Sequence, residues 1–542
     1  MSSPLFLVGF MGAGKTTVGK LVAARRGRRF VDLDDEIAAA GGAPTAELVA
    51  RDEPAFRRLE AATLARLITA GGDPLIIATG GGAAAHGDNL DRMRAAGLVV
   101  TLSVSPEGVR ARCGHQSGRP LLPETRDQVA ALLRRREPSY RRAHAVVDTD
   151  GLGAEAVAER VLTVEDVWRT TTAAIPAAST TLLALGDRTY PIVVSPGPLD
   201  GALIRALLPP TTRLVALVTD GNVRAAWGDS ARNALAAAGL DVRVATVAPG
   251  EGSKAISTYH RLCEELIGDG LDRSSAIVAV GGGVVGDLAG FVAATILRGI
   301  PVVQVPTTLV AMTDSAIGGK TGIDLAAGKN LVGAFWQPRL VAAHLPVLAT
   351  LPARERRAAF GELWKYALLD GEETWAAVDA LTGWAAGGDH APLPPGLADV
   401  VERAARFKAW IVARDERETR GERALLNLGH TIGHAIEAEA GWRLLHGECV
   451  ALGLIAAARV SAALGLAAPV LEERIVDAVR RSGLDAGLDP WLGDAVLARV
   501  GVDKKRTGSR IGFVAVREVG ACEVVPVETS EISRILRARA AL

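Results

Sequence analysis

The chain has 542 residues, and its 61 lysines and arginines are balanced by 61 aspartates and glutamates. This length is several times that of an average domain, so we expect at least two domains, and three fit the length better. The zero formal net charge argues against nucleic-acid and membrane-surface binding and favours small-molecule partners.

Cysteine usage and the first residues indicate the compartment. Cys113, Cys263, Cys449 and Cys522 are widely spaced and form no C-x-x-C pair, so neither a disulfide framework nor a thiolate zinc site is predicted. The chain opens with the strand-like run "PLFLVGF", without a signal-peptide pattern, and contains no uncharged apolar stretch of about 18 residues. These features predict a soluble, cytoplasmic protein.

Residues 1–166 are predicted to form a first domain, in which short apolar runs alternate with longer polar-faced segments. The predicted strands are "PLFLVGF", "PLIIAT", "LVVTLSV" and "AVVDTD". This alternation is typical of β-α-β units, so we expect a parallel sheet with helices on both faces. Residues 167–182 cluster Thr, Ser, Ala and Pro without clear periodicity and are predicted to be a linker.

A second α/β pattern occupies residues 183–345. Its predicted strands are "TRLVALVTD", "DVRVATVAPGE", "SAIVAVGGG" and "IPVVQVPTT". From residue 346 to 542 long segments rich in Ala, Leu, Glu and Arg have helical spacing, and "RIGFVAV" and "ACEVVPV" form a predicted hairpin near the end. We therefore expect an α/β domain followed by a mostly helical one.

The segment Gly9–Thr16 satisfies G-x-x-x-x-G-K-[ST], after a predicted strand and before a predicted helix. Both contextual conditions for a phosphate-binding loop are met. Backbone N–H groups would hold the phosphates, Lys15 would reach the β and γ groups, and the Thr16 hydroxyl would ligate magnesium. The predicted ATP-binding residues here are Gly12, Ala13, Gly14, Lys15, Thr16 and Thr17.

Two acids follow the next predicted strand. "FVDLDDEI" places Asp32 and Asp34 two residues apart at a predicted strand end, where alternation would point both side chains to one side. Beside a phosphate loop, one acid could hold magnesium and the other could act as base or anchor for an acceptor hydroxyl. Without that loop they would be interpreted as solvated loop acids.

The first 165 residues resemble shikimate kinases. The resemblance rests on the phosphate loop followed, in order, by "DLD" (Asp32–Asp34), "FRRLE" (Phe56–Glu60), "TGGG" (Thr79–Gly82), "RPLL" (Arg119–Leu122) and "RREPSY" (Arg135–Tyr140). It implies shikimate binding by Asp34, Arg57, Gly81 and Arg136, and magnesium on Thr16 and Asp32. It also implies that Lys15, Asp34 and Arg119 are catalytic. Arg119 would lie on a mobile lid and would also contact ATP. The segment before Phe56 is one residue shorter than the family pattern, so the assignment of Arg57 in place of Arg58 depends on how the two sequences are aligned.

Three of the nine histidines are close together near residue 440. His430 and His434 have the i, i+4 spacing that puts two ligands on one helix face, and His446 follows in "LLHGE". With Glu437 and Glu439 nearby, this segment predicts a metal or catalytic cluster. Since it lacks thiolates, the site would be of the open, catalytic type.

A second glycine-rich turn, "VGGGVVGDLAG", follows the predicted strand "SAIVAV". Its spacing is not G-x-G-x-x-G, so by itself it is weak evidence for a dinucleotide. Three other segments strengthen that interpretation. They are "PGEGSK", "PTT" and "GGKTGIDLAAGKN", and all are predicted at strand ends or loops, where doubly wound folds bind ligands.

Residues 183–542 resemble 3-dehydroquinate synthases. The matching segments are "GGGVVGDLAGFVAATILRGIPVVQVPTTL", "DSAIGGKTGID", "GKNLVGAFWQP", "GELWKYALLDG", "RALLNLGHTIGHAIEAE" and "HGE". The resemblance implies NAD on Glu251, Lys254, Gly283, Val284, Val285, Gly286, Asp287, Thr307, Thr308, Lys320 and Lys329.

The same resemblance implies zinc, or cobalt in its place, on Glu362, His430 and His446. Here it departs from the i, i+4 argument, which favours His434 as a ligand; the family pattern makes His434 a proton-transfer or substrate residue, and we follow it. The implied substrate residues are Arg298, Lys320, Asn330, Lys365, Lys408, Arg423, Asn427, His434, Lys504 and Lys505. Lys320, Lys365 and His434 would be catalytic, and Arg298 would reach the site of a neighbouring subunit in a homodimer formed by the synthase half.

The two resemblances together imply a bifunctional enzyme of aromatic amino acid biosynthesis. One half would phosphorylate shikimate with ATP and magnesium; the other would convert 3-deoxy-D-arabino-heptulosonate 7-phosphate to 3-dehydroquinate and phosphate with NAD and zinc. The alternatives are a metal-dependent polyol dehydrogenase fused to another small-molecule kinase, and a chain with one catalytically inactive regulatory half. A polyol would not require the cation set Lys320, Lys365, Arg423 and Lys504 or Lys505.

Overall fold

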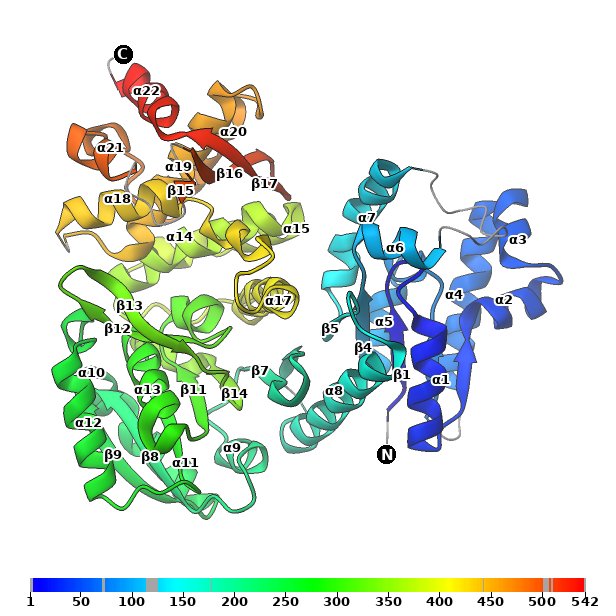
Figure 1. The fold of residues 1–542 in the computed structure, drawn as a ribbon, viewed down its shortest axis with the longest axis horizontal. Helices are drawn as coiled ribbons and strands as arrows, with labels where there is room; N and C mark the ends of the chain where they lie inside the picture. The colour runs from blue at the N-terminus through cyan, green and yellow to red at the C-terminus, as the bar shows by residue number, and fades with distance from the viewer. Residues whose placement is uncertain are drawn as a thin grey trace. The chain divides into compact units, whose positions relative to one another are not determined.

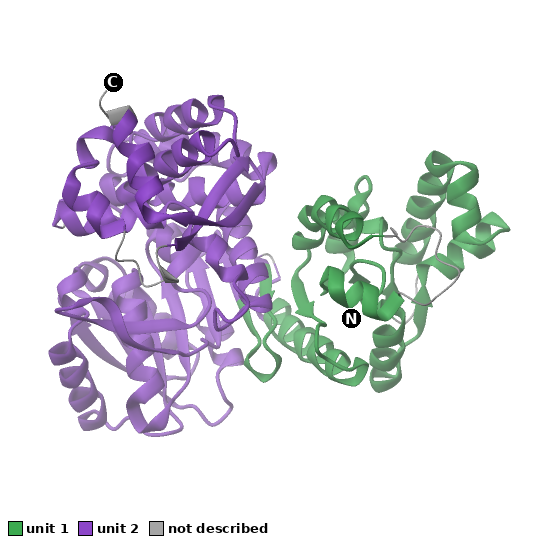
Figure 2. Ribbon diagram, turned by 45° about the horizontal axis from the view of Figure 1, so that its top comes forward, with its two compact units in different colours: residues 1–173, 180–191 green, residues 174–179, 192–542 purple. Residues whose placement is uncertain are grey.

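The computed structural model describes residues 3–70, 74–113, 125–176, 178–441, 443–500, 506–507 and 510–540. The chain forms two compact units (Figure 2). Unit 1 consists of Met1–Ala173 and Thr180–Pro191, and unit 2 consists of Ala174–Ser179 and Ile192–Leu542. Within the described residues, no helix has both the length and the apolar character needed to cross a bilayer.

Unit 1 is built on a parallel sheet. Its strands are β1 (Leu5–Val8), β2 (Phe30–Asp32), β3 (Ile76–Ala78), β4 (Leu98–Ser103), β5 (Ala145–Asp148) and β6 (Ser179–Leu183). They pair in the order β2-β3-β1-β4-β5-β6, each parallel to its neighbour. The side chains of β1 and β3 are buried on both faces, which explains why these strands are continuous apolar runs.

Helices connect these strands. They are α1 (Lys15–Arg26), α2 (Leu33–Gly41), α3 (Thr45–Arg51), α4 (Glu53–Thr69), α5 (Asn89–Ala96), α6 (Pro106–Cys113), α7 (Arg126–Arg141) and α8 (Ala154–Ala174), with the 3₁₀ turn η1 (Ala83–Ala85). The turn from β1 to α1 begins at Gly9, whose φ is 135°. A Cβ there would lie 2.4 Å from the Leu102 carbonyl oxygen, so the loop requires glycine at this position.

Unit 2 begins with a second parallel sheet. Its strands are β7 (Tyr190–Ser195), β8 (Leu214–Asp220), β9 (Asp241–Val247), β10 (Ala276–Gly281), β11 (Val302–Pro306) and β14 (Leu340–His344), in the order β7-β14-β11-β10-β8-β9. One face packs against α9 (Gly201–Leu207) and α11 (Asp229–Ala237), and the other against α12 (Ile256–Gly268) and α13 (Gly283–Thr295) (Figure 1). The sheet is thus doubly wound, as expected.

Short elements complete this α/β part. They are α10 (Gly221–Val223), the turns η2 (Gly186–Arg188), η3 (Arg224–Gly228), η4 (Glu251–Ser253), η5 (Ile296–Arg298), η6 (Ala311–Ser315) and η7 (Leu345–Thr350), and the strands β12 (Lys320–Leu325) and β13 (Gly328–Phe335). The last two form an antiparallel hairpin whose inner side chains pack on α13. The segment "GGKTGIDLAAGKN", expected at a strand end or loop, is therefore largely hairpin.

The remainder of unit 2 is mostly helical. Its elements are α14 (Ala353–Asp370), α15 (Glu372–Asp379), α16 (Thr382–Ala386), α17 (Leu397–Arg414), η8 (Glu422–Asn427), α18 (His430–Ala440), α19 (His446–Ala463), α20 (Val470–Arg481), η9 (Asp489–Trp491), α21 (Asp494–Val500), β15 (Arg506–Thr507), β16 (Arg510–Glu518), β17 (Ala521–Glu528) and α22 (Thr529–Ala540). Strands β16 and β17 are the predicted hairpin. The predicted fold class is confirmed for all three parts.

The predicted linker at 167–182 is wrong for most of its length. Residues up to Ala174 continue α8, and Ser179 already begins β6. The threonine run is compatible with a helix because each hydroxyl donates to the carbonyl four residues earlier, as from Thr170 to Asp166 and from Thr171 to Val167. Only residues 175–178 lie between the two elements. The subdivision of unit 2 at residue 345 stays a prediction, since both parts cluster as one unit.

Candidate functional site

The phosphate loop lies at the carboxyl end of β1 and leads into α1. Lys15 Nζ donates to the Gly9 and Phe10 carbonyls at 2.9 and 3.0 Å, so this ammonium closes the loop. Thr16 Oγ1 donates to Asp32 Oδ2 at 2.7 Å. The two predicted magnesium residues are therefore adjacent, in an arrangement that a hydrated cation at the loop could use. Gly12 and Gly14 have positive φ in the turn before α1, where the Ala13 N–H donates to the Phe10 carbonyl at 3.2 Å, and the first turn of α1 includes Thr17.

Asp34 lies in the first turn of α2 and not in a strand, so the expected reason for its proximity to Asp32 is wrong. Asp32 caps α2 by accepting from the Asp34 backbone N–H at 3.1 Å. Burial and then the neighbouring Asp32 carboxylate raise the pKa of Asp34 to about 6, although the Lys15 charge opposes this. A carboxyl group with this pKa is suited to accept a proton near neutral pH.

Three consecutive glycines let two arginines approach this acid. Arg136 Nη1 donates to the Gly81 carbonyl at 3.1 Å. A Cβ at Gly82 would lie 2.9 Å from both terminal nitrogens of Arg57, and one at Gly80 would lie 2.7 Å from Asp34 Oδ1. The absence of a Cβ at Gly80 and Gly82 thus lets the Asp34 and Arg57 side chains lie against the backbone of this turn.

Arg57 is held by the buried Glu60, which accepts from its Nη1 at 2.9 Å. Arg58 is exposed on the other side of α4. The structure therefore brings Arg57, Arg136 and Asp34 around one glycine turn, which favours the Arg57 register. Arg119, the predicted lid residue, lies outside the described residues.

One residue near the phosphate loop was missed by the sequence analysis. Arg112, at the end of α6, donates to the Gly12 carbonyl at 3.3 Å and to the Thr149 hydroxyl at 2.8 Å. The segment around it, a short helix that also contains Arg110, carries no recognisable signal. Only the fold brings it to the nucleotide loop.

In unit 2, the predicted dinucleotide residues meet at the carboxyl end of β10. Lys254 is buried, and its Nζ lies 2.9 Å from Asp287 Oδ2 and donates to the Asn330 side chain. Burial would lower the pKa of Lys254, but Asp287 and Glu251 raise it overall. Asn330 has a φ of 53°, a left-handed conformation that is costly outside glycine and common at ligand sites.

The glycine turn that precedes α13 is tightly packed. The Val285 side chain is buried in the core, so only its backbone could face a ligand, whereas Val284 is half-buried. A Cβ at Gly283 would lie 3.0 Å from Ser315 Oγ, and one at Gly286 would lie 2.8 Å from Gln304 Oε1. Within the described residues the buried Thr307 hydroxyl has no hydrogen-bond partner, while the Thr308 hydroxyl accepts from the Ala311 N–H. This turn fits the pyrophosphate of a dinucleotide, which needs backbone donors and close approach.

A cluster of buried charges lies where η6 meets α14 and α17. Lys365 Nζ is 3.1 Å from Asp314 Oδ2 and also contacts Glu362, and Lys408 Nζ donates to the Asp314 carbonyl at 2.8 Å and to its carboxylate. Burial lowers the pKa of Lys408 to about 8. Burial would also lower the pKa of Lys365, but Asp314 and Glu362 raise it overall. Asp314 was not predicted from the sequence, although it joins two predicted lysines.

Glu362 also faces the histidine cluster. His446 Nε2 lies 3.1 Å and His430 Nε2 lies 3.3 Å from the same oxygen, Glu362 Oε1. His430 Nδ1 faces the Leu428 carbonyl at 3.0 Å and His446 Nδ1 faces Glu437 Oε2 at 3.3 Å. Each ring thus directs one nitrogen to Glu362 and the other to an oxygen, the arrangement in which histidines ligate zinc.

The protonation of this cluster fits a cation site. Burial lowers the pKa of His430, so its ring is neutral. Burial would also lower the pKa of His446, but its hydrogen bonds to Glu362 and Glu437 raise it to about 10. A divalent cation at Glu362 would replace the Nε2 proton of His446, so these residues fit a bound metal.

His434 lies on α18, the helix that begins at His430, and is exposed. Ligand atoms of His430, His434 and His446 all lie within 4.8 Å of one another. Its proximity is compatible with a ligand and with a proton-transfer residue at the rim, so its assigned role stays a prediction.

The β12–β13 hairpin contacts the helical part through two ion pairs. Lys320 pairs with Glu418, and Lys329 Nζ lies 2.8 Å from Glu437 Oε1 and 3.7 Å from Glu251. Burial would raise the pKa of Glu437, but His446 and Lys329 lower it to about 2. The dinucleotide residues and the histidine cluster are thus directly linked.

Two other predicted substrate residues, Arg423 and Asn427, lie in η8. Arg423 donates to the Glu416 carbonyl at 2.6 Å, and its guanidinium lies over Phe335 of the hairpin. Asn427, in η8, donates to the Ala424 carbonyl. Arg298 is exposed at the far end of α13 from Gly283. Lys504 and Lys505 lie outside the described residues.

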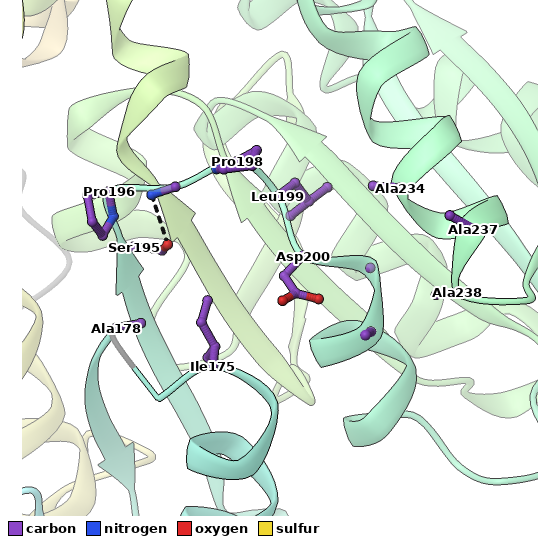
Figure 3. A pocket seen from close by; sticks show the side chains of 13 residues that line it. Ile175, Ala178, Ser195, Pro196, Pro198, Leu199, Asp200, Ala234, Ala237 and Ala238 are labelled. Atoms are coloured by element: carbon purple, nitrogen blue, oxygen red, sulfur yellow. Dashed lines mark hydrogen bonds between the residues drawn. The ribbon is translucent and has the colours of Figure 1, made fainter.

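A pocket of about 590 Å³ lies elsewhere in unit 2 and contains none of the predicted residues (Figure 3). It is lined mainly by Ala, Pro, Leu and Ile, including Ile175, Pro196 and Ala234. Its polar side chains already serve the backbone, since Ser195 accepts from the Gly197 N–H and Asp200 from the Leu203 N–H. This pocket offers no reactive group and is not the candidate site.

Comparison with protein families assigns both units. The shikimate kinase model matches residues 11–165, and the models of the N-terminal and C-terminal parts of 3-dehydroquinate synthase match residues 244–358 and 359–506. The 3-dehydroquinate synthase of Symbiobacterium thermophilum is 47% identical over 351 residues, which cover 64% of this chain and 96% of that protein.

Solved structures of related synthases are similar to unit 2. A 2-deoxy-scyllo-inosose synthase with carbaglucose-6-phosphate, NAD⁺ and Co²⁺ is 26% identical and has a TM-score of 0.59; the match covers 66% of this chain and 99% of that one. A 2-epi-5-epi-valiolone synthase from Streptomyces hygroscopicus with NAD⁺ and Zn²⁺ is also 26% identical, with a TM-score of 0.59, 65% of this chain and 97% of that one being covered.

Proposed function

Since the chain belongs to the 3-dehydroquinate synthase family and carries a shikimate kinase domain, it is a bifunctional enzyme of the shikimate pathway, and we propose which residues perform its two reactions. Neither a polyol dehydrogenase nor an inactive half is favoured by any of the family matches. The kinase is unit 1, and the synthase is unit 2.

In the kinase, ATP binds the loop Gly9–Thr16 with magnesium beside Thr16 and Asp32. Arg57 and Arg136 clamp the shikimate carboxylate, which matches a planar guanidinium fork. Asp34 accepts the proton of the attacking hydroxyl, for which its raised pKa suits it. Lys15 and the loop N–H groups stabilise the charge of the transferring phosphoryl group, together with Arg119.

In the synthase, the turn before α13 would hold NAD, which would supply reversible hydride transfer. Zinc or cobalt on Glu362, His430 and His446 would polarise the substrate hydroxyl and the carbonyl formed from it. Lys320, Lys365, Lys408 and Arg423 neutralise the phosphate and carboxylate of 3-deoxy-D-arabino-heptulosonate 7-phosphate, with Asn330 and Asn427 as further donors. His434, exposed at the rim, transfers a proton.

The observation that carries the synthase proposal is the meeting of three sets of groups. The Glu362, His430 and His446 cluster contacts Lys365, and through Glu437 it contacts Lys329 of the dinucleotide hairpin. A site that oxidises a hydroxyl next to a phosphorylated chain needs a metal, a dinucleotide and cations at one place, and this arrangement brings together the residues proposed for all three.

Two assays on the purified full chain test the proposal. We expect phosphate release from the heptulosonate phosphate that requires NAD and zinc, and ADP formation that requires shikimate and magnesium. His446→Ala should abolish only the first activity and Lys15→Met only the second. A folded, magnesium-supplied chain without shikimate-dependent ADP formation would contradict the kinase assignment.

The proposal includes a homodimer formed by the synthase half. Leu297 and Arg298 both have positive φ, 53° and 69°, a strained conformation that needs a reason. Arg298 follows α13, whose 13 residues span about 20 Å, so it is far from the turn at the other end of the same helix. A dimer in which Arg298 completes the partner's site explains both features.

Mixed dimers test this arrangement. Co-expression of Arg298→Ala and His446→Ala chains should restore synthase activity, because one site of the mixed dimer then has an intact metal cluster and an intact arginine. Activity no higher than that of the separate variants would refute the shared site.

The cytoplasmic location, which we also propose, is supported by the four free cysteines.

A further inference from the structure

Glu437 uses its two carboxylate oxygens for different parts of the synthase unit. Oε2 faces His446 Nδ1 at 3.3 Å, and Oε1 accepts from Lys329 Nζ at 2.8 Å. His446 belongs to the metal cluster, whereas Lys329 lies on the hairpin that carries dinucleotide residues. The Glu437 side chain is only 11% exposed, whereas those of His446 and Lys329 are partly exposed.

The contact with Glu437 sets the tautomer of His446 in the metal-bound state. A carboxylate only accepts, so Glu437 keeps the proton on Nδ1 when a metal replaces the proton on Nε2, the nitrogen that faces Glu362. Such a partner also fixes the ring plane and increases the basicity of the ligand nitrogen.

The contact with Lys329 links this ring to the dinucleotide residues. Lys329 Nζ is also 3.7 Å from Glu251, and the neighbouring Asn330 accepts from Lys254. Asn330 is held in its left-handed conformation, with its backbone N–H bonded to Asp324 at 2.8 Å. These hydrogen bonds hold the end of the hairpin, and a ligand that restrains Lys329 also restrains Glu437.

We propose that Glu437 is a positioning residue that couples dinucleotide binding to metal binding, by orienting His446 with one oxygen and holding Lys329 with the other. This inference rests on the proposed function, because it takes the metal cluster and the dinucleotide hairpin as assigned there. Glu437 touches neither substrate nor cofactor in this role. NAD therefore tightens zinc binding, and zinc tightens NAD binding by the same factor.

Glu437→Gln separates this role from mere packing. A glutamine has nearly the same size, but its amide has only one accepting oxygen and would direct its NH₂ group at either His446 or Lys329. We expect zinc affinity, measured by chelator competition, to fall about 10- to 100-fold. The dependence of that affinity on NAD should fall from about fivefold or more to none.

Lys329→Met is the second variant and lies on the exposed hairpin, where a loss of folding is not expected. It should leave the His446 contact in place, so zinc affinity falls less than in Glu437→Gln, while the NAD dependence is lost equally. The double variant should show no further loss of the NAD dependence. Glu439→Gln is the matched control, since Glu439 is exposed two residues along the same helix and pairs with Arg499 at 3.8 Å.

The visible spectrum of bound Co²⁺ gives a readout that does not depend on turnover. It should change in Glu437→Gln and remain unchanged in Glu439→Gln. Wild-type zinc affinity and an unchanged cobalt spectrum in Glu437→Gln, or an unchanged NAD dependence in Lys329→Met, would overturn the inference. An inactive wild-type synthase supplied with NAD and zinc would instead overturn the proposed function.

Discussion

Asp314 and Lys408 form an ion pair in the interior of the synthase unit, with the Lys408 ammonium bound to both the carboxylate and the backbone carbonyl of Asp314. Lys365 lies 3.1 Å from the other carboxylate oxygen, so Asp314 pairs with both buried lysines, and Lys365 has Glu362 as a second partner. Because burial lowers the pKa of Lys408 to about 8, Asp314 is what keeps that lysine largely charged at neutral pH.

Removing the Asp314 charge should therefore destabilise the synthase unit and shift the Lys408 titration. Asp314→Asn leaves two buried ammonium groups with Glu362 alone, which should cost about 3–5 kcal/mol of unfolding free energy. The pKa of Lys408 should fall further, since Asp314 raises it. Denaturant unfolding measures the first effect and the pH profile of synthase activity the second.

Asp379→Asn is the matched control for this substitution, because Asp379 pairs with Arg481 at the surface. It should change the unfolding free energy by less than about 1 kcal/mol. Equal losses of unfolding free energy in the two variants would show that the buried ion pairs contribute no more to stability than a surface ion pair does.

Metal binding should release about one proton per synthase site at pH 7.5. His446 has a pKa raised to about 10 between Glu362 and Glu437 and is protonated before metal binds, whereas His430 is already neutral. Calorimetric zinc titrations in buffers of different ionisation enthalpy measure this number. A release of no protons would mean that His446 is not a ligand, and His446→Ala should abolish the release.

The synthase unit should lose stability as the pH falls from about 6.5 to about 4. His344 is buried, and burial lowers its pKa to about 4, below the ordinary value of about 6.5 that it has in the unfolded chain. The unfolded state therefore binds more protons in this window, and the unfolding free energy decreases by up to about 3 kcal/mol.

His344→Gln removes the titrating group, so its unfolding free energy should depend less on pH than that of the wild type over this window. His260→Gln, at an exposed position of α12, should retain the wild-type dependence. Identical pH profiles for His344→Gln and the wild type would contradict the assignment of this effect to His344.

Arg57→Lys should raise the KM for shikimate about tenfold or more and leave the KM for ATP unchanged. Lysine preserves the charge that Glu60 needs but loses the planar fork that binds a carboxylate through two hydrogen bonds. Arg58→Lys, at the exposed neighbouring position, should have no effect. Steady-state kinetics with both substrates decide between the two registers, and an effect at Arg58 alone would reverse the assignment.

Much of the candidate site could be predicted because it is encoded by short segments. The phosphate loop, the glycine turn before α13 and the pair His430 and His434 each depend on a strand-turn-helix or helical spacing, which is set within a few residues. The strands were predictable for the same reason, since their continuous apolar runs reflect burial on both faces.

The errors occurred where side-chain hydrogen bonds with the nearby backbone, which composition does not show, accompany the local structure. The threonines before Ala174 were predicted to form a linker, but they continue α8, where their hydroxyls bond to carbonyls of the preceding turn. Asp34 follows a strand in the sequence but lies in α2, because the chain turns at Asp32 and this residue caps the helix.

The two families, the order of the two enzymes and nearly all of the candidate residues could be predicted from the amino-acid sequence, because motifs for phosphate, dinucleotide and metal sites are local. Which charged side chains lie next to one another depends instead on the folding of distant segments. Asp314 meets Lys408 across 94 positions, and Lys329 meets Glu437 across 108. Such pairs depend on how helices pack on a sheet, and the resulting burial sets the pKa values that spacing along the chain does not encode.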